Sequence, residues 1–263
     1  MMSEELSVIR DSSQARGDTR SAFFRKAGVG GAALVGGSVL LGAGASVASA
    51  ARAGHLDAVP DVDVLNFALT LEYLEASFYV QALGSGAGAL PTGVPASSGK
   101  FNRGAVTGAK QLAGFGGRTR STAYGYLSQI RNHEVAHVAF LQTALGAAAV
   151  PACTFKFDAG LKNVSTFLAT AQVLENTGVM AYDGAIRYIE TGDYLQAGAQ
   201  IATIEARHAS YLNLINRTSP FPNPFDGGKK PSEIVTAVLA TGFVASCPQP
   251  VLDLFARFTA AGA

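Results

Sequence analysis

The stretch Glu134-Val135-Ala136-His137 has a counterpart further along the chain, Glu205-Ala206-Arg207-His208. In each stretch the glutamate and the histidine are three residues apart, so both side chains emerge on the same face of a helix. The other residues on these two faces are apolar or aromatic; they are Leu127, Ile130, Leu141, Leu145, Tyr194, Ile201, Leu212 and Ile215. A carboxylate on a core-facing helix face is costly unless it is neutralised, paired or bound to a metal ion. The repeated stretch therefore predicts a polar site inside a helical core.

Two more glutamates, Glu72 and Glu175, lie on apolar helix faces, and each is followed seven residues later by a tyrosine, Tyr79 or Tyr182. The order along the chain is thus Glu, Glu-x-x-His, Glu, Glu-x-x-His, which is one helical hairpin used twice. A bundle of two such hairpins can bring all six side chains into one central layer. We therefore predict a metal site formed by Glu72, Glu134, His137, Glu175, Glu205 and His208.

The chemistry of these side chains indicates which ions they would bind. Carboxylates and imidazoles together suit iron or manganese, and also zinc. The four carboxylates balance the charge of two divalent cations when both histidines are neutral, so two ions are expected rather than one. Glu75 lies three residues after Glu72 and could replace it or act as an additional ligand. Tyr79 and Tyr182 either lie beside the ions as supporting or redox groups or are ordinary core residues.

The composition fits a chain with one large core. Of its 263 residues, 48% are hydrophobic and only 15% are charged, and the formal net charge is +1. No strand-like alternation competes with the helical pattern, so the predicted fold class is all-α. No basic stripe is present in the sequence, so a nucleic-acid-binding surface is not expected.

The helical pattern predicts a bundle over residues 61–217. Its four helices are expected at residues 61–83, 121–145, 163–190 and 193–217. Residues 146–162 are long enough to cross the bundle from one end to the other. Only Thr191 and Gly192 separate the last two helices, which must therefore be antiparallel neighbours.

Two segments are expected outside the regular bundle. Residues 84–117, rich in glycine, serine, alanine and proline, are predicted to be a long loop inserted between the first two helices. Residues 218–263 are predicted to be a C-terminal extension with a short helix over 232–243 and an apolar tail. The two cysteines, Cys153 and Cys247, could form a disulfide or remain two buried thiols, because the sequence does not give their distance.

The first fifty residues are predicted to be an export signal. A charged region around Arg25 precedes an uncharged apolar run and a small-residue cleavage site, Ala48-Ser49-Ala50. The segment resembles a twin-arginine signal, although Ser21 stands where the second arginine belongs. After a linker over residues 51–60, the mature protein is expected in the periplasm, in the cell envelope or secreted, without a membrane anchor. An uncleaved membrane anchor is the alternative.

The order of the six site residues resembles that of the ferritin-like superfamily of di-metal carboxylate bundles, in particular the exported ferritin-like proteins called desiccation-related. The resemblance covers residues 61–217 and implies a ferritin-like four-helix bundle. It implies that Glu72 and Glu175 come from the first and third helices, and that some of the carboxylates bridge two ions. It also implies a di-iron or di-manganese centre that reacts with dioxygen or peroxide, by Fe(II) oxidation or peroxide disproportionation, in protection against oxidative or desiccation stress. An oligomer is compatible with this resemblance.

Two other functions fit parts of the sequence. His133-Glu134-Val135-Ala136-His137 matches the H-E-x-x-H motif of zinc metalloproteases, in which both histidines bind zinc and the glutamate is the general base. That interpretation leaves the other glutamates unexplained, and the position that matches His133 in the second stretch is Ile204. We expect His133 on the surface or beside a metal-binding residue. In the second alternative, the ions only stabilise the bundle, which then has a structural role.

Overall fold

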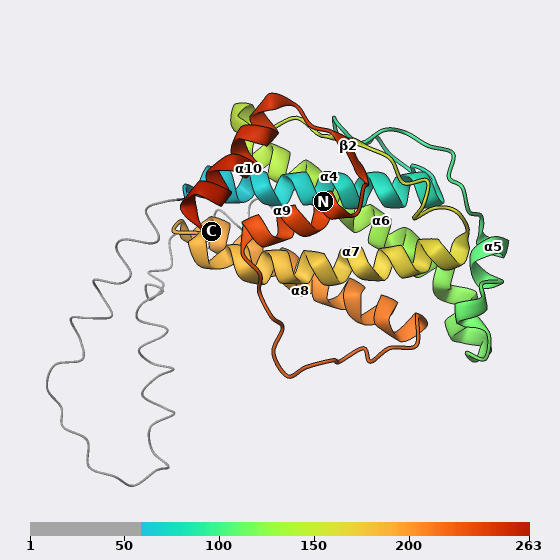
Figure 1. Ribbon diagram of the computed structural model, residues 1–263. Coiled ribbons are helices and arrows are strands. Elements are labelled where there is room, and N and C mark those ends of the chain that lie inside the picture. Colours follow the sequence, from blue (N-terminus) through green and yellow to red (C-terminus); the bar gives the residue numbers. More distant parts are fainter. Residues whose placement is uncertain (1–58) are drawn as a thin grey trace, which may run out of the picture. The chain divides into compact units, whose positions relative to one another are not determined.

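The computed structural model describes residues 59–263, so the predicted export signal (1–50) and most of the predicted linker lie outside the described residues. Four long helices dominate the described part: α4 (Asp61–Leu83), α6 (Gly117–Leu145), α7 (Val164–Ala185) and α8 (Gly192–Ile215). They lie lengthwise against one another as a bundle (Figure 1). The predicted all-α class is therefore confirmed. None of the described helices is both long enough and apolar enough to cross a membrane.

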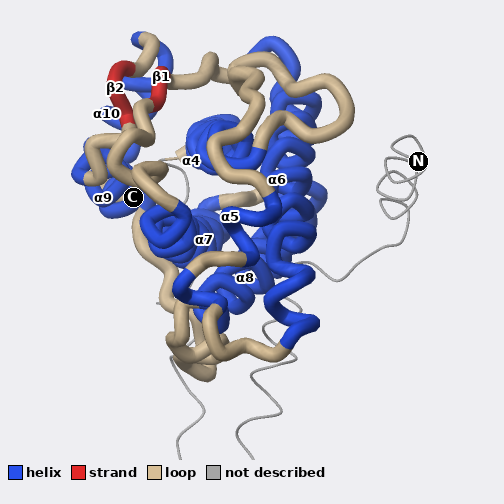
Figure 2. The backbone as a smooth tube through the Cα atoms, turned by 90° about the vertical axis from the view of Figure 1, so that its right-hand side faces the viewer, coloured by secondary structure: helices blue, strands red, loops and turns tan. Residues whose placement is uncertain are grey.

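The bundle consists of two antiparallel hairpins, as the repeated sequence pattern predicts. α4 packs along α6, α7 packs along α8, and contacts between α4 and α7 join the two hairpins. After α6 and the short helix η3 (Gly146–Ala148), the chain returns along the length of the bundle to the start of α7 (Figure 1). The turn between α7 and α8 contains one short helix, η4 (Ile186–Tyr188). Figure 2 shows the helices from the end of the bundle.

The first helix, α4, is buried along almost its whole length. Pro60 precedes it in an extended conformation, two acidic residues lie in its first turn, and Gly84 ends it at a φ of 89°. A positive φ of this size is readily adopted only by glycine. Because 20 of its 23 residues are buried, the helix has cover on all sides. The other bundle helices cover part of its surface, and the C-terminal extension covers another part.

The C-terminal extension packs against α4 and α7. It contains α9 (Pro231–Ala240), β2 (Val244–Ser246) and α10 (Gln249–Ala261), which lie on one side of the bundle (Figure 2). The Phe258 ring meets the Phe67 ring edge-on at a centroid distance of 5.3 Å. The Arg257 guanidinium donates to the Asp63 carboxylate at 2.7 and 2.9 Å. These contacts attach the extension to the start of α4.

A disulfide links the crossing segment to the extension. Cys153 and Cys247 are bonded, so of the two alternatives left open by the sequence the structure contains the bridge. Next to it, β1 (Thr154–Phe155) pairs with β2 as an antiparallel two-stranded sheet. No strand was predicted, and that expectation was wrong. Strands of two and three residues are too short to show an alternating pattern, and their pairing depends on contacts between distant parts of the chain.

Four predictions about helical structure also need correction. The segment predicted as a loop contains a helical turn, α5 (Arg103–Thr107), and the short helix η2 (Lys110–Leu112), which contribute Val106 and Leu112 to the core. The second bundle helix begins at Gly117, four residues earlier than predicted. The third ends at Ala185 instead of residue 190. The apolar tail forms a second C-terminal helix, α10, because its apolar side has α4 and α9 to pack against.

Two apolar clusters fill the bundle on either side of a polar layer. One contains Phe78, Tyr79 and Phe167 together with the apolar residues that precede Glu134 and Glu175. The other contains apolar residues that follow His137 and precede Glu72 and Glu205, including Leu69, Leu141 and Ile201. We call these the Tyr79 end and the Tyr182 end of the bundle, after the tyrosine that each contains.

Candidate metal centre

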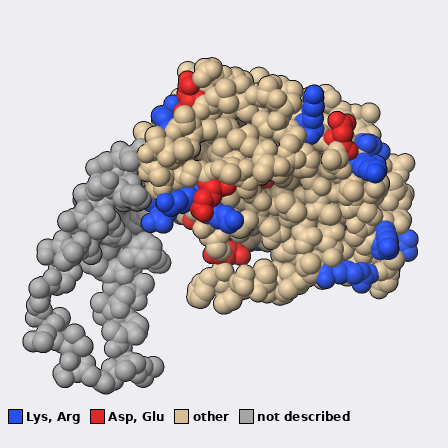
Figure 3. Space-filling model, viewed as in Figure 1, with Lys and Arg blue, Asp and Glu red and all other residues tan. Residues whose placement is uncertain are grey.

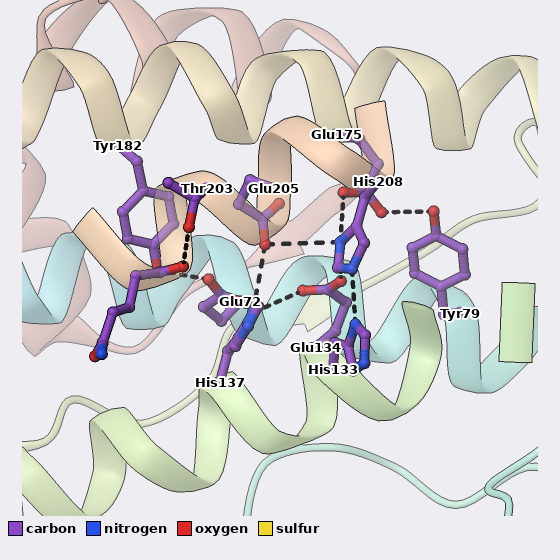
Figure 4. Close-up of polar contacts among 11 residues, drawn as sticks. Glu72, Tyr79, His133, Glu134, His137, Glu175, Tyr182, Thr203, Glu205 and His208 are labelled. Carbon is purple, nitrogen blue, oxygen red and sulfur yellow. Dashed lines mark hydrogen bonds and ion pairs between the residues drawn. The ribbon is translucent and has the colours of Figure 1, made fainter. Parts of the chain in front are cut away.

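All six predicted site residues converge in the polar layer (Figure 4). Every glutamate among them is 0% exposed, and the histidines are 9% (His137) and 4% (His208) exposed. Glu72 comes from α4, Glu175 from α7, and one Glu-x-x-His pair comes from each of α6 and α8. Each hairpin thus contributes one single glutamate and one pair. Five of the 19 acidic residues of the chain are buried here when Glu75 is included. On the face of the molecule in Figure 3, by contrast, charged side chains are scattered among uncharged ones.

The side chains form two overlapping groups whose ligand atoms lie within 4.8 Å of one another. The first group consists of Glu72, Glu134, His137 and Glu205, and the second consists of Glu134, Glu175, Glu205 and His208. Glu134 and Glu205 therefore belong to both groups. This is the arrangement that two neighbouring ions bridged by two carboxylates would require.

The histidines direct the same ring atom, Nδ1, toward the carboxylates. His137 Nδ1 lies 3.2 Å from Glu72 Oε2, 3.1 Å from Glu134 Oε2 and 3.3 Å from Glu205 Oε1. His208 Nδ1 lies 2.9 Å from Glu134 Oε1 and 3.1 Å from Glu175 Oε2. The two imidazoles are equivalent in this respect, as the repeated sequence pattern implies.

Glu205 provides a test of whether the residues fit a metal ion. Its Oε2 has no hydrogen-bond partner, and its Oε1 faces His137 Nδ1 at 3.3 Å without a well-formed hydrogen bond, although the side chain is fully buried. A buried carboxylate normally accepts hydrogen bonds, because its desolvation is otherwise uncompensated. A cation held between the two groups would supply the missing interaction, so the donor set fits a metal site.

Two tyrosines are hydrogen-bonded to the single glutamates across the hairpins. Tyr79 of α4 donates to Glu175 Oε1 at 2.6 Å, and Tyr182 of α7 donates to Glu72 Oε1 at 2.5 Å. In both glutamates the other oxygen, Oε2, faces a histidine. Burial, reinforced by the neighbouring carboxylates, raises the pKa of both tyrosines well above the usual range. Both phenols therefore remain neutral donors that orient the two carboxylates.

His133 lies beside the site on the solvent side. Its side chain is exposed, its Nδ1 is 2.9 Å from His208 Nε2, and the two rings stack with centroids 5.2 Å apart. When His208 Nδ1 faces the ions, its Nε2–H can donate to His133. His133 belongs to neither group of ligand atoms, and Glu134 is enclosed between His137 and His208. This geometry favours the bundle site over the protease interpretation.

Glu75 lies next to the site but outside both groups. It is 3% exposed, and its carboxylate lies against Gly178 of α7. A Cβ at Gly178 would be 3.3 Å from Glu75 Oε1 and 3.0 Å from Glu205 Oε2. Gly178 thus leaves the space that both carboxylates use. The sequence prediction missed it, although a signal exists: Gly178 follows Glu175 by three residues, as Glu75 follows Glu72.

Burial raises the pKa of most of these carboxyl groups, because water no longer stabilises their charged form. The surrounding carboxylates add to this effect in Glu75 and Glu205, whose pKa values lie well above the usual range. Burial also raises the pKa of Glu72 and of Glu175. If all these groups were ionised in one pocket, their desolvation and mutual repulsion would destabilise the folded protein unless protons or cations neutralised them.

In Glu134 and the two histidines, the contacts between them shift the pKa values toward the charged forms. Burial alone would raise the pKa of Glu134, but its contacts with His208 and His137 outweigh this effect and lower it. Glu134 raises the pKa of His208 to about 11, and Glu72 and Glu134 raise the pKa of His137 well above its usual range, although burial opposes both shifts. Divalent ions would displace protons from the imidazoles and carboxyl groups, so metal affinity is expected to rise with pH.

The comparison with known families agrees with this geometry. A family model described as the ferritin-like domain matches residues 60–217. The matched segment contains all six residues of the polar layer and ends before the C-terminal extension. No curated protein matches the chain.

Proposed function

Because this chain belongs to the ferritin-like family, we propose that its bundle holds two iron or two manganese ions and reduces dioxygen or peroxide at them. One observation carries this proposal: Glu134 and Glu205 are fully buried and belong to both groups of ligand atoms. A carboxylate with two oxygens can bind one ion through each of them, so two shared glutamates would fix two ions side by side.

The residues of the chain have distinct roles in this proposal. Glu72 with His137 would hold one ion, and Glu175 with His208 would hold the other, while Glu134 and Glu205 would bridge them. Tyr79 and Tyr182 hold the single glutamates in position through their hydrogen bonds. The apolar clusters at both ends exclude bulk water from the polar layer. The ions themselves would supply the electrons that reduce the oxidant.

The predicted export signal extends the proposal to a biological role. If residues 1–50 direct export, the reaction takes place outside the cytoplasm, where it would remove Fe(II) or peroxide and protect the cell against oxidative or desiccation stress.

Anaerobic loading with two equivalents of Fe(II), followed by dioxygen, tests this function. We expect both ferrous ions of each chain to be oxidised faster than Fe(II) in buffer. A manganese-loaded sample is assayed in parallel for peroxide loss. Glu205→Gln removes the reaction, whereas Glu190→Gln, an exposed glutamate, leaves it unchanged. Fe(II) and Mn(II) samples that consume neither oxidant above the buffer rate would overturn the proposal.

A structural function is the second candidate, and the complete burial of the four glutamates favours it. Ions bound only by the folded chain would stabilise it by mass action. Metal that raises the melting temperature without any turnover would support this role instead of the redox reaction.

A further inference from the structure

An apolar cavity lies between the bundle helices at the Tyr182 end. Its volume is about 30 Å³, and its wall includes Ala68, Leu71, Leu141, Tyr182, Ala197 and Ile201. All six of these residues are buried. Gly198, which is also part of the wall, is only partly buried, so the cavity approaches the surface along α8. We call it the Tyr182 cavity.

The Tyr182 cavity is adjacent to one half of the metal site. Ala68 is four residues before Glu72 on α4, and Ile201 is four residues before Glu205 on α8. Four residues correspond to about one helical turn, or roughly 6 Å along the axis. Tyr182 itself forms part of the wall and donates to Glu72. A molecule in the cavity would therefore be separated from the site by little more than this hydrogen-bonded pair.

Size and polarity restrict what the cavity can hold. A cavity of this volume has room for one or two molecules the size of water. A buried water needs roughly two to four polar partners. The wall is almost entirely carbon, and the Tyr182 hydroxyl hydrogen is already donated to Glu72, so a water molecule would lack these partners. Peroxide would lose its hydrogen bonds here in the same way. A small apolar molecule loses none.

We propose that the Tyr182 cavity binds dioxygen beside the half of the site that contains Glu72 and His137, which we call the Glu72 half; Glu175 and His208 form the Glu175 half. The inference rests on the proposed function and narrows it, because it selects dioxygen over peroxide as the oxidant that the fold accommodates. The opposite end offers a contrast. Tyr79 is 0% exposed and packed between Phe78 and Phe167, whose ring centroids lie 5.7 and 6.0 Å from its own.

Dioxygen binding can be measured without any metal, through the paramagnetic relaxation that dissolved dioxygen causes in methyl NMR signals. In the metal-free protein under dioxygen pressure, we expect the methyl groups of Ala68, Ala197 and Ile201 to relax several-fold more strongly than that of Ala109. Ala109 is 7% exposed, close to the 7–9% of these three residues, but lies at the Tyr79 end. Equal relaxation at both ends would overturn the proposal, whether or not the loaded protein is active.

Two variants locate the effect in the cavity. A Cβ at Gly198 would lie 3.8 Å from Ile186, an ordinary contact, so Gly198→Leu can be accommodated and places its side chain at the wall. Gly125→Leu on α6, where a Cβ meets nothing within 4 Å, is the matched control. Gly198→Leu, and Ala68→Leu from the opposite wall, should abolish the excess relaxation, and Gly125→Leu should retain it. Excess relaxation that persists in both cavity variants contradicts the proposal.

The loaded protein provides a separate measurement. In a single turnover of the Fe(II)-loaded protein, Gly198→Leu should raise the dioxygen concentration that gives half the maximal oxidation rate several-fold with the maximal rate unchanged, and oxidation by peroxide should stay at the wild-type rate. An unchanged half-saturating dioxygen concentration would show that dioxygen does not reach the ions through this cavity. If wild-type protein consumes no dioxygen, the proposed function fails, and the relaxation experiment still decides the cavity.

Discussion

The two halves of the candidate metal centre hold their single glutamates through the same contacts, but the residues that surround the two halves differ. In each half a tyrosine from the opposite hairpin holds one oxygen of the single glutamate, and a histidine Nδ1 faces the other oxygen. The Glu175 half is enclosed by the aromatic cluster at the Tyr79 end, and His133 is stacked on its histidine. The Glu72 half adjoins the Tyr182 cavity, and Ile204 occupies the position that corresponds to His133. The repeat therefore explains the shared arrangement of the candidate ligands, while the deviations from it distinguish the two halves.

This difference has a physical meaning for the proposed chemistry. Equivalent ligands give two ions similar charge and geometry, whereas access and hydrogen bonding around them need not be equal. The half beside the cavity is suited to receive an apolar oxidant. The half beside His133 has a hydrogen-bonded route from its histidine to the surface.

The largest effect is expected where the two halves overlap. Glu134→Gln or Glu205→Gln removes a carboxylate that belongs to both groups, so each variant should lose both ions. Glu72→Gln or Glu175→Gln affects one group and should retain about one ion per chain. Metal content measured after gel filtration distinguishes these outcomes, with Glu190→Gln as the control. Two ions retained in Glu205→Gln would show that the halves do not share it.

His133→Ala should weaken metal binding in the Glu175 half and leave the Glu72 half unchanged. Loss of the hydrogen bond to His208 Nε2 removes the group that orients this imidazole, which typically weakens metal binding by about 10–100-fold. Only the ion at His208 should be affected. Calorimetric titration with Mn(II) resolves the two binding steps, and Ile204→Ala at the corresponding position should alter neither. An equal loss in both steps, or none, argues against this role.

The two tyrosines should differ in their contribution to stability. Tyr79→Phe removes the hydroxyl donor of Glu175 Oε1 inside the aromatic cluster, where water has no access, and should lower the free energy of unfolding by about 1–3 kcal/mol. Tyr182→Phe should cost less, because Tyr182 is 7% exposed and lines a cavity that approaches the surface, so its hydroxyl is less completely buried than that of Tyr79. Urea unfolding of the metal-free variants measures both values. A larger loss for Tyr182→Phe would reverse the expected order.

The smallest effect concerns the Tyr182 end, where Asp61 accepts hydrogen bonds from the backbone of Glu190 and Thr191 at 2.9 Å each. Burial opposes ionisation, but the bonds from Thr191 and Glu190 outweigh it and lower the pKa of Asp61. A lowered folded-state pKa gives stability that is present above the unfolded value, about 3.9, and is lost as the pH falls through the folded value.

Asp61→Asn should therefore lower stability at neutral pH by at most about 1 kcal/mol, because the carboxylate is partly exposed. The difference from wild type should shrink below pH 4 (about the unfolded pKa). Unfolding measured across this pH range gives the comparison, and Asp158→Asn, at an exposed residue of the crossing segment, is the control. A difference that grows toward acid pH would show that Asp61 does not act through its charge.

The convergence of the six candidate residues could be predicted from the sequence, because their positions follow from helical spacing. A glutamate and a histidine three residues apart must share a helix face, and the apolar neighbours determine that this face is buried. The two-hairpin order then leaves few ways to arrange the four helices. For the same reason the bundle class and the crossing segment were predicted correctly.

Features that depend on contacts between distant segments of the chain could not be predicted from helical spacing. The Tyr182 cavity and the contact of Glu75 with Gly178 arise from side chains on different helices. The pairing of β1 with β2 joins segments about ninety residues apart in the chain, at the Cys153–Cys247 bridge, where the sequence separation is 94. The helical character of α10 depends on α4, which its apolar face covers. Apart from the three-residue spacing that relates Gly178 to Glu175 as Glu75 to Glu72, none of these relations has a local sequence signal of its own.

Anomalous diffraction from crystals of the chain grown with Mn(II) tests the central claim most directly. The account predicts two manganese peaks in the polar layer, one beside Glu72 and His137 and the other beside Glu175 and His208, with Glu134 and Glu205 contacting both. A single peak, a peak held by His133, or an empty polar layer would contradict it.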